Sequence, residues 1–287
     1  MAYLIIVSLI WSASFALFKS QLANLDASLT AALRLTLALI VFLPFFRPSL
    51  LKIREALMYL ATGSIQYGLM YVLLNQSYAY LNGWQVALMT MLTPIYIVLL
   101  DGIWKRHVNM VFLFASFLTV SGAVIVLSKG QAIETGSLRG CLLVQAADIC
   151  FAFGQLVYRY QRLKSPDIRD RNIYALMFVG GASLALLSCL MNGNQGELLQ
   201  ISSKQWLTLV YLGTVSSGLC MFWWNLGATK VSTGILAALS NIKVPLAVFV
   251  SIALFGENAG HWPSLIVGSV VMLAGILIAR KKASLMA

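Results

Sequence analysis

The chain has 287 residues, of which 60% are hydrophobic and only 10% are charged. Soluble domains contain roughly 45–50% apolar and about 25% charged residues, so this composition and a mean hydropathy of +0.85 indicate an integral membrane protein. The net charge of +11 does not indicate a nucleic-acid binder, because the basic residues occur singly or in twos and threes between hydrophobic segments, as membrane topology signals do. Four cysteines without a C-x-x-C motif indicate neither a disulfide framework nor a zinc site.

Ten apolar segments follow one another along the chain, each close to the roughly 20 residues that a helix needs to cross a membrane. The connections between them are short and polar, with Pro, Asn, Asp and Ser where the chain must reverse. The sequence therefore predicts an all-α integral membrane protein with ten transmembrane helices. These spans are expected at 2–20, 28–46, 56–75, 83–104, 108–128, 138–158, 172–192, 205–226, 232–255 and 261–279.

Lysine and arginine are distributed unequally between alternate loops. One side collects 14 of the 20 basic residues and the other side collects 4, while Arg34 and Lys243 lie within spans. Positive charge accumulates on the cytoplasmic side of a membrane. The distribution therefore predicts a multi-pass protein with both termini in the cytoplasm.

The two halves of the chain carry matching residues. Leu92-Thr-Pro94-Ile corresponds to Lys243-Val-Pro245-Leu at an offset of 151, and Asn75 corresponds to Asn225 at an offset of 150. Five spans per half is an odd number, so a duplicated half must insert upside down relative to the first. We expect two inverted five-helix repeats, 1–130 and 131–287, an arrangement that places transporter sites near the midplane between the repeats.

Three stretches of the chain resemble the EamA-type family of the drug/metabolite transporter superfamily. They are Ile10-Trp-Ser-Ala-Ser-Phe-Ala-Leu-Phe-Lys19, Val86-Ala-Leu-Met-Thr-Met-Leu-Thr-Pro94 and Gly234-Ile-Leu-Ala-Ala-Leu-Ser-Asn-Ile-Lys-Val-Pro245 followed by Leu254-Phe-Gly-Glu257. The resemblance covers nearly the whole chain. It implies a ten-helix carrier of the bacterial inner membrane that usually exports amino acids or other small metabolites through a central cavity. Where such proteins often have Leu-Gly-Glu after the fourth helix, this chain has Leu100-Asp101-Gly-Ile-Trp-Lys105.

Two charged residues fall at membrane depth, Asp148 near the midpoint of the sixth predicted span and Lys243 near that of the ninth. A charge there costs about 2.5 to 3.5 kcal/mol on insertion scales and is expected to face a cavity or a partner. The simplest hypothesis is that Asp148 and Lys243 face each other across the repeat interface. Either they form a fixed ion pair between the two helices, or substrate or a proton competes for one of them.

Polar and aromatic side chains recur at helical spacing on single faces of several spans, and such faces do not meet lipid. Together with the two charges, they give the predicted substrate-binding residues: Ser12, Tyr67, Tyr71, Asn75, Gln85, Met89, Gln145, Asp148, Trp223, Asn241 and Lys243.

Several of these positions have a second interpretation. Ser12 is a small residue that equally marks close helix packing, and Trp223 lies near a helix end where tryptophan anchors at the interface. Arg34 is expected to extend its long stem to the external interface, and a ligand-binding role is its second interpretation. Tyr78 and Tyr80 are expected to anchor at the end of the third span.

These observations predict a secondary transporter that exports small metabolites, with amino acids as the leading class, by alternating access around a midplane cavity. The alternatives are a drug, sugar or nucleotide-sugar carrier of the same superfamily, or a membrane channel or structural subunit. No H-E-x-x-H, G-x-S-x-G or Walker loop is present, so no enzyme activity, catalytic residue, metal or cofactor is expected.

The expected partners are a small-molecule substrate and the lipid bilayer, without nucleic acid. The protein is expected to be a monomer or a homodimer. Small residues in the fifth and tenth spans pack these helices against each other or against another copy of the chain; they are Ser121, Gly122, Gly268, Ser269 and Gly275.

Overall fold

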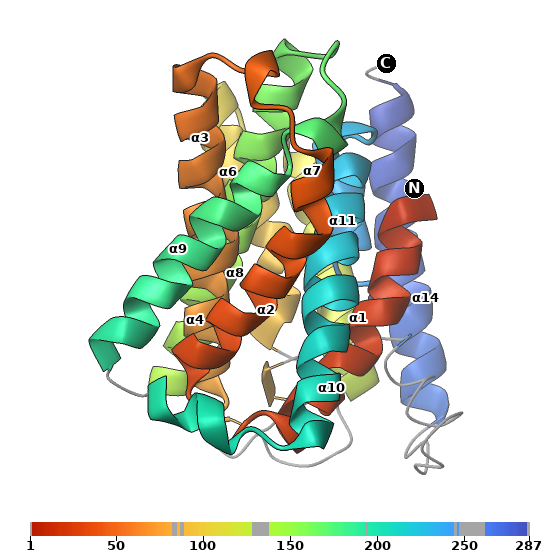
Figure 1. Ribbon diagram of the computed structural model, residues 1–287. Helices are drawn as coiled ribbons and strands as arrows, with labels where there is room; N and C mark the ends of the chain where they lie inside the picture. The colour runs from red at the N-terminus through yellow and green to blue at the C-terminus, as the bar shows by residue number, and fades with distance from the viewer. Residues whose placement is uncertain are drawn as a thin grey trace.

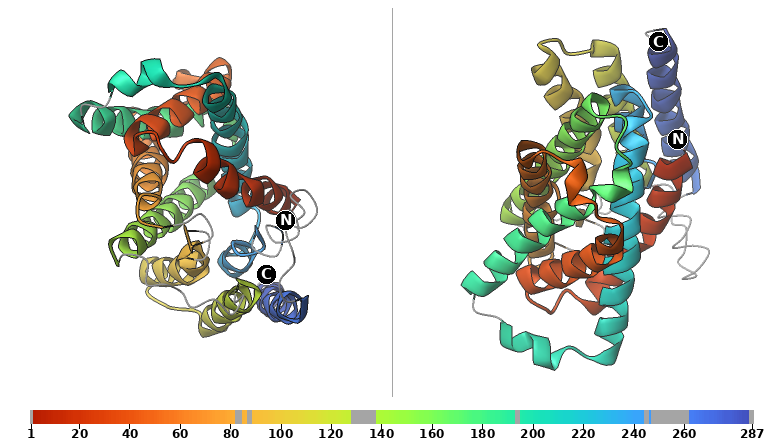
Figure 2. Two further views of the ribbon diagram at one scale, coloured as in Figure 1. Left: turned by 90° about the horizontal axis from the view of Figure 1, so that it is seen from below. Right: turned by 45° about the horizontal axis from the view of Figure 1, so that its top comes forward.

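The computed structural model describes residues 2–81, 85–86, 89–127, 138–192, 195–243, 246 and 262–285. Within these ranges the chain is helical and contains no strand. Figure 1 shows long helices running side by side as a bundle, and Figure 2 shows the same bundle from one end and from a tilted direction.

The first half of the chain contributes six α-helices and one π-helical segment to the described part of the bundle. They are α1 (Ala2–Gln21), α2 (Ala27–Phe42), α3 (Ile53–Gly63), the π segment η3 (Ser64–Leu69), α4 (Met70–Ser77), α6 (Thr93–Lys105) and α7 (Met110–Leu127). Short 3-10 turns are η1 (Leu43–Phe45), η2 (Pro48–Leu50) and η4 (Thr90–Leu92).

The second half of the described chain is built in a similar way. It contains α8 (Leu138–Lys164), α9 (Ala175–Asn192), α10 (Ser203–Tyr211), the π segment η7 (Leu212–Leu219), α11 (Cys220–Thr229), α12 (Thr233–Leu239) and α14 (Trp262–Ser284). The turns η5 (Asp170–Asn172) and η6 (Gln195–Gln200) flank α9.

Within the described residues, seven helical segments are long and apolar enough to cross a membrane, and they agree with seven of the predicted spans. They lie at Ala2–Gln21, Ala27–Phe45, Ile53–Ser77, Leu138–Lys164, Ala175–Asn192, Ser203–Thr229 and Pro263–Ser284. An eighth apolar helix, Met110–Ile125, is shorter. The predicted spans 83–104 and 232–255 lie partly outside the described residues, so the count of ten stays a prediction.

The two π segments lie in corresponding long helices. One interrupts the continuous helix 53–77 and the other interrupts the helix 203–229, which begins 150 residues later. π-helical turns are rare and frequently occur at functional sites. Their correspondence agrees with the prediction of repeated halves, whose inverted arrangement stays a prediction.

Helices α7 and α14 pack closely against each other, as one of the two interpretations of their small residues predicts. A Cβ atom added to Gly122 would lie 2.5 Å from the carbonyl oxygen of Gly268, and one added to Gly275 would lie 2.8 Å from that of Ala115. These glycines therefore serve contact within the chain, which removes the need for a second copy to explain them.

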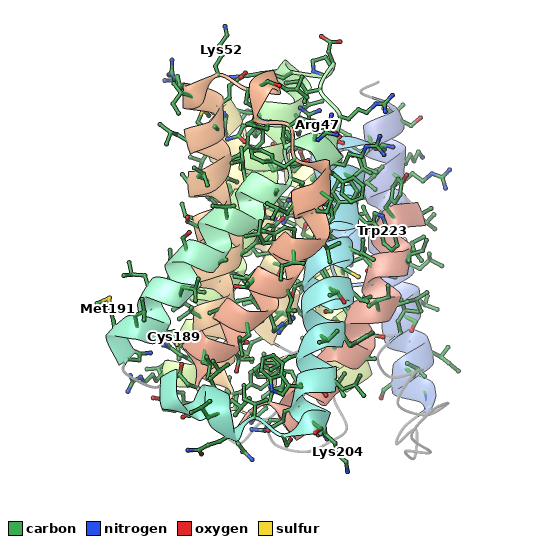
Figure 3. All side chains as sticks on the ribbon, viewed as in Figure 1. Arg47, Lys52, Cys189, Met191, Lys204 and Trp223 are labelled. Atoms are coloured by element: carbon green, nitrogen blue, oxygen red, sulfur yellow. The ribbon has the colours of Figure 1, made fainter. Side chains whose placement is uncertain are left out.

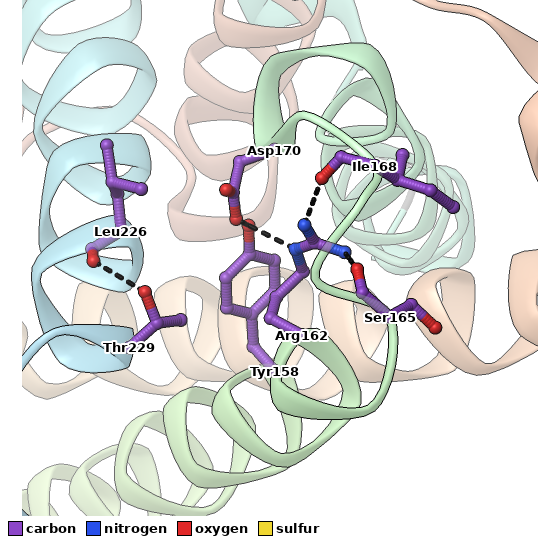
Figure 4. Close-up of polar contacts among 7 residues, drawn as sticks. All are labelled: Tyr158, Arg162, Ser165, Ile168, Asp170, Leu226 and Thr229. Atoms are coloured by element: carbon purple, nitrogen blue, oxygen red, sulfur yellow. Dashed lines mark hydrogen bonds and ion pairs between the residues drawn. The ribbon is translucent and has the colours of Figure 1, made fainter.

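Helix α8 is six residues longer than predicted. A buried polar cluster joins its last turns to the connection that follows (Figure 4). Arg162 lies beyond the predicted span 138–158, yet it is only 5% exposed. It forms an ion pair of 2.9 Å with Asp170 and donates to the carbonyl of Ser165 at 2.7 Å and to that of Ile168. Tyr158 donates to the same carboxylate of Asp170. Arg162 thus fixes the connection between α8 and α9 through hydrogen bonds to the backbone carbonyl groups of that connection.

Candidate functional site

A cavity with a volume of about 90 Å³ lies between helices of both halves. Its apolar wall consists of Trp11, Phe18, Met70, Leu74, Ala147, Phe151 and Met221. Its polar wall consists of Ser14, Arg34, Tyr71, Asn75, Tyr78, Thr90, Thr93, Asp148, Ser216 and Lys243. Apolar side chains combined with converging polar groups in one cavity are typical of a small-molecule site.

The cavity wall joins the two halves through helix α1. The indole nitrogen of Trp11 donates to the carbonyl oxygen of Ser216 at 2.9 Å, and the hydroxyl of Ser14 donates to that of Ser216 at 3.0 Å. Ser216 belongs to the π segment η7. One irregular stretch of helix therefore provides part of the cavity surface, where irregular backbone at membrane depth is tolerated because it borders a cavity.

Arg34 lies inside this cavity, not at the external interface as expected from the sequence. Arg34 is 5% exposed. Nε and Nη2 donate to the hydroxyl of Ser217 at 3.2 and 3.0 Å, and Nη2 also donates to that of Tyr71 at 3.3 Å. The guanidinium carbon lies 4.4 Å from the centre of the Tyr71 ring and 5.8 Å from that of Phe18. Hydrogen bonds and aromatic rings therefore hold the cation in place and replace the interfacial water it would otherwise seek.

Asp148 and Lys243 line the same cavity, as the sequence analysis predicted from their depth. They interact electrostatically with each other. Asp148 is 5% exposed, and its buried Oδ2 atom has no hydrogen-bond partner among the described residues. A buried acceptor that lacks a partner carries a desolvation penalty of about 1–3 kcal/mol, or more for a charged group. The cavity therefore presents an acceptor that a ligand donor would satisfy.

Two further predicted residues line the cavity, Tyr71 and Asn75. Asn75 donates from Nδ2 to the carbonyl of Ala27 at 3.1 Å, while its buried Oδ1 has no hydrogen-bond partner in the described part of the chain. Four of the predicted binding residues therefore meet at one cavity: Tyr71, Asn75, Asp148 and Lys243.

Tyr67 belongs to a different buried cluster, although regular helical spacing predicts that it lies on the same face as Tyr71. Its hydroxyl contacts that of Tyr174 and accepts a hydrogen bond of 2.8 Å from Asn225. Gln66 and Asn225 exchange hydrogen bonds of 3.0 and 3.1 Å between their amides. The change to π-helical geometry at η3 separates Tyr67 from the face that Tyr71 presents, because it breaks the regular helical spacing used in the prediction.

The remaining predicted residues lie outside the cavity lining. Ser12 donates to Leu9 of its own helix at 2.6 Å, and Asn241 donates to the carbonyl of Met91 at 2.9 Å. Gln145 accepts from Tyr96 at 2.8 Å and donates to the carbonyl of Met89 at 3.2 Å. Gln85 is buried. Trp223 is half-buried beside a core cluster around α11, where Figure 3 labels it.

The sequence analysis missed several residues that line the cavity. Tyr78 was expected at the interface, yet it is 5% exposed and its ring lies 4.7 Å from that of Phe18. Trp11 and Phe18 are large apolar residues in a predominantly apolar helix, so their residue type alone does not distinguish them from lipid-facing residues. Arg34 did carry a signal, since a charge inside a span indicates a functional position.

Comparison with known proteins shows the relationship of this chain. The model of the EamA-like transporter family matches residues 1–128 and 138–280. The chain is 35% identical over 283 residues to a protein of Salmonella typhimurium named "Biotin transporter", covering 98% of this chain and 93% of that protein. A protein of Escherichia coli K12 with the same name is 34% identical over the same shares.

Two further matches extend the comparison. A "Probable biotin transporter" of Pseudomonas aeruginosa is 34% identical over 282 residues, covering 98% of this chain and 97% of that protein. A protein of known crystal structure superposes with a TM-score of 0.76 over 98% of this chain and 97% of its own at 17% identity, which shows a shared fold.

These matches support a multi-pass membrane transporter of small molecules with bacterial relatives, not an enzyme. They agree with the family resemblance of the sequence motifs, while amino-acid export finds no support among them. The chain belongs to the EamA-like transporter family.

Proposed function

We propose that this protein transports biotin across the bacterial inner membrane through the cavity lined by Arg34, Asp148 and Lys243. The observation that carries the proposal is the identity of 34–35% over 98% of the chain with proteins named as biotin transporters in Salmonella and Escherichia coli. That identity spans both halves, so it includes the helices that line the cavity.

The chemistry of the cavity supports this substrate. Biotin consists of a carboxylate, an apolar chain and a bicyclic urea with N–H donors and a carbonyl acceptor. The cavity offers cations, a mostly apolar wall and the unpartnered acceptor atoms of Asp148 and Asn75. A ligand that is apolar in the middle and polar at both ends matches this lining better than a small amino acid.

The transport step that fits this architecture is alternating access, in which one half rocks against the other around the cavity. The two π segments support this mechanism, because both lie at corresponding positions in long helices and η7 contributes Ser216 to the cavity wall. Proton exchange on Asp148 and passive exchange of substrate are both compatible with the mechanism.

We propose that both termini lie in the cytoplasm. Figure 3 places Arg47 and Lys52 at one end of the bundle and Lys204 at the opposite end. In Figure 1 helix α14 extends toward the end that carries Arg47 and Lys52, and helix α1 begins in the same half of the bundle. The end with more basic residues is the cytoplasmic one under the positive-inside rule.

Counterflow in proteoliposomes tests the proposal. Vesicles containing the full chain are loaded with unlabelled biotin and diluted into labelled biotin, with protein-free vesicles as the control. Transient, saturable accumulation is expected. Parallel vesicles loaded with a mixture of amino acids and diluted into labelled amino acids test the alternative substrate class; accumulation only in that arm would replace biotin with an amino acid. Net flux in cells expressing the protein then gives the direction of transport.

A further inference from the structure

Among the charged side chains described in the cavity, Arg34 is the one without a counter-ion. The acid in the cavity, Asp148, interacts electrostatically with Lys243. In the described part of the chain, Arg34 contacts hydroxyl groups and aromatic rings, and no carboxylate lies within ion-pair distance of it. A buried charge at membrane depth is normally paired, so the missing partner indicates an anion that is bound from outside the protein.

The donors of Arg34 are only partly used. A guanidinium carries five N–H groups in a rigid fork. The hydrogen bonds to Ser217 and Tyr71 involve Nε and Nη2, and within the described residues none involves Nη1. The two N–H groups of Nη1 therefore remain for a ligand in the cavity that Arg34 lines.

The surroundings hold this fork in a fixed orientation. Ser217 accepts from both used nitrogens and itself donates to the Tyr71 hydroxyl at 3.0 Å. The Tyr71 ring lies against the guanidinium at 4.4 Å. Because helix α2, helix α4 and the π segment η7 each contribute one of these residues, the side chain loses little freedom when it binds an anion.

We propose that Arg34 binds the carboxylate of the transported molecule and is the main determinant of selectivity for acids over their neutral derivatives. The inference rests on the proposed function for the identity of the substrate, but not for the preference itself. Lys243 instead offsets Asp148, so the opposite, uncharged end of the ligand lies near that pair.

The test compares the binding of acids and amides by the purified full chain in detergent. The first pair of ligands is biotin and biotinamide. The second pair is N-acetyl tryptophan and N-acetyl tryptophan amide. The variants are Arg34→Gln and Arg34→Lys. Arg54→Gln is the matched control, because Arg54 is exposed on α3 and outside the cavity lining. Equilibrium binding of labelled ligand, with competition by the unlabelled analogues, gives each affinity.

We expect wild-type protein and Arg54→Gln to bind biotin about tenfold to a hundredfold more tightly than biotinamide, the range for a hydrogen-bonded charge. Arg34→Gln should lose this preference while its affinity for biotinamide changes little, and Arg34→Lys should keep part of it. A purely structural role for Arg34 would instead weaken acid and amide equally. That result would overturn the inference.

The wild-type measurement keeps the test valid if Arg34→Gln fails to fold. Equal affinity of wild-type protein for biotin and biotinamide would overturn the inference without any variant. Binding of N-acetyl tryptophan over its amide, with no binding of biotin, would refute biotin as the substrate and support the carboxylate site. Binding of no acid in the set would overturn both proposals.

Discussion

The side-chain amides of Gln66 and Asn225 exchange two hydrogen bonds, 3.0 Å from Gln66 to Asn225 and 3.1 Å in return. Both residues are fully buried. Gln66 belongs to the π segment η3 of the first half and Asn225 to helix α11 of the second. This pair therefore links the two halves through a polar contact whose loss would leave two buried amides unsatisfied.

Replacement of one member of this pair should destabilise the protein. We expect Gln66→Leu to lower the free energy of unfolding by about 1–3 kcal/mol, because it leaves the buried amide oxygen of Asn225 without the donor from Gln66. Combining it with Asn225→Leu should cost less than the sum of the single changes. Thermal and denaturant unfolding in detergent measure both. Gln200→Leu, at an exposed position, is the control. Strictly additive losses of the two single variants would show that Gln66 and Asn225 do not stabilise the protein through each other.

Gly154 should tolerate no larger residue. A Cβ atom at this position of α8 would lie 2.2 Å from the Cβ of Gln66, while one at Gly196 would have no atom within 4 Å. We expect Gly154→Ala to destabilise the protein by about 1–3 kcal/mol through overpacking, and Gly196→Ala to have little effect. Unfolding in detergent compares the two variants. Equal stability of both would contradict this close approach of α8 and η3.

The buried ion pair between Arg162 of α8 and Asp170 should contribute more to stability than an ion pair with an exposed lysine. Asp170→Asn removes the carboxylate that accepts from Arg162 and Tyr158, and we expect a loss of about 1–3 kcal/mol together with faster proteolysis between α8 and α9. Lys105→Gln breaks the ion pair between Lys105 and Asp101, in which the lysine side chain is 53% exposed. This change should lower the free energy of unfolding by less than about 1 kcal/mol. A larger loss from Lys105→Gln would reverse this order.

The charges of Asp148 and Lys243 should both be needed for transport. We expect Asp148→Asn, Lys243→Gln and the double variant each to reduce counterflow of biotin at least about tenfold, because each removes a group that faces the ligand. Counterflow rates at matched protein content in vesicles measure the effect. If the double variant transports normally, the two residues form only a fixed ion pair, and the binding role assigned to them is wrong.

The orientation of the chain can be measured with cysteine labelling. Lys52→Cys and Lys204→Cys each add one thiol, at opposite ends of the bundle (Figure 3). We expect an impermeant thiol reagent to label the second variant in intact cells and the first only after the membrane is opened, because the basic end is cytoplasmic. The parent chain, with its four native cysteines, gives the background. The opposite labelling would invert the proposed topology.

The sequence by itself determined that this chain is helical and spans a membrane, and its motifs indicated the family. Seven of the predicted spans recur in the structure within a few residues, since a span needs only a long run of apolar residues, which is a local property. The depth of Asp148 and Lys243 was equally readable, because depth follows from position within a span. Both residues line the cavity.

Only the tertiary structure decided which polar faces meet at that cavity. Tyr67 and Tyr71 are four residues apart, yet one joins the Gln66–Asn225 cluster and the other contacts Arg34. Helical periodicity assumes regular spacing, and the π segment η3 breaks it. The role of Arg34 depends in turn on Ser217, 183 residues away in the sequence. A contact between distant segments leaves no local pattern, so only the packed structure identifies it.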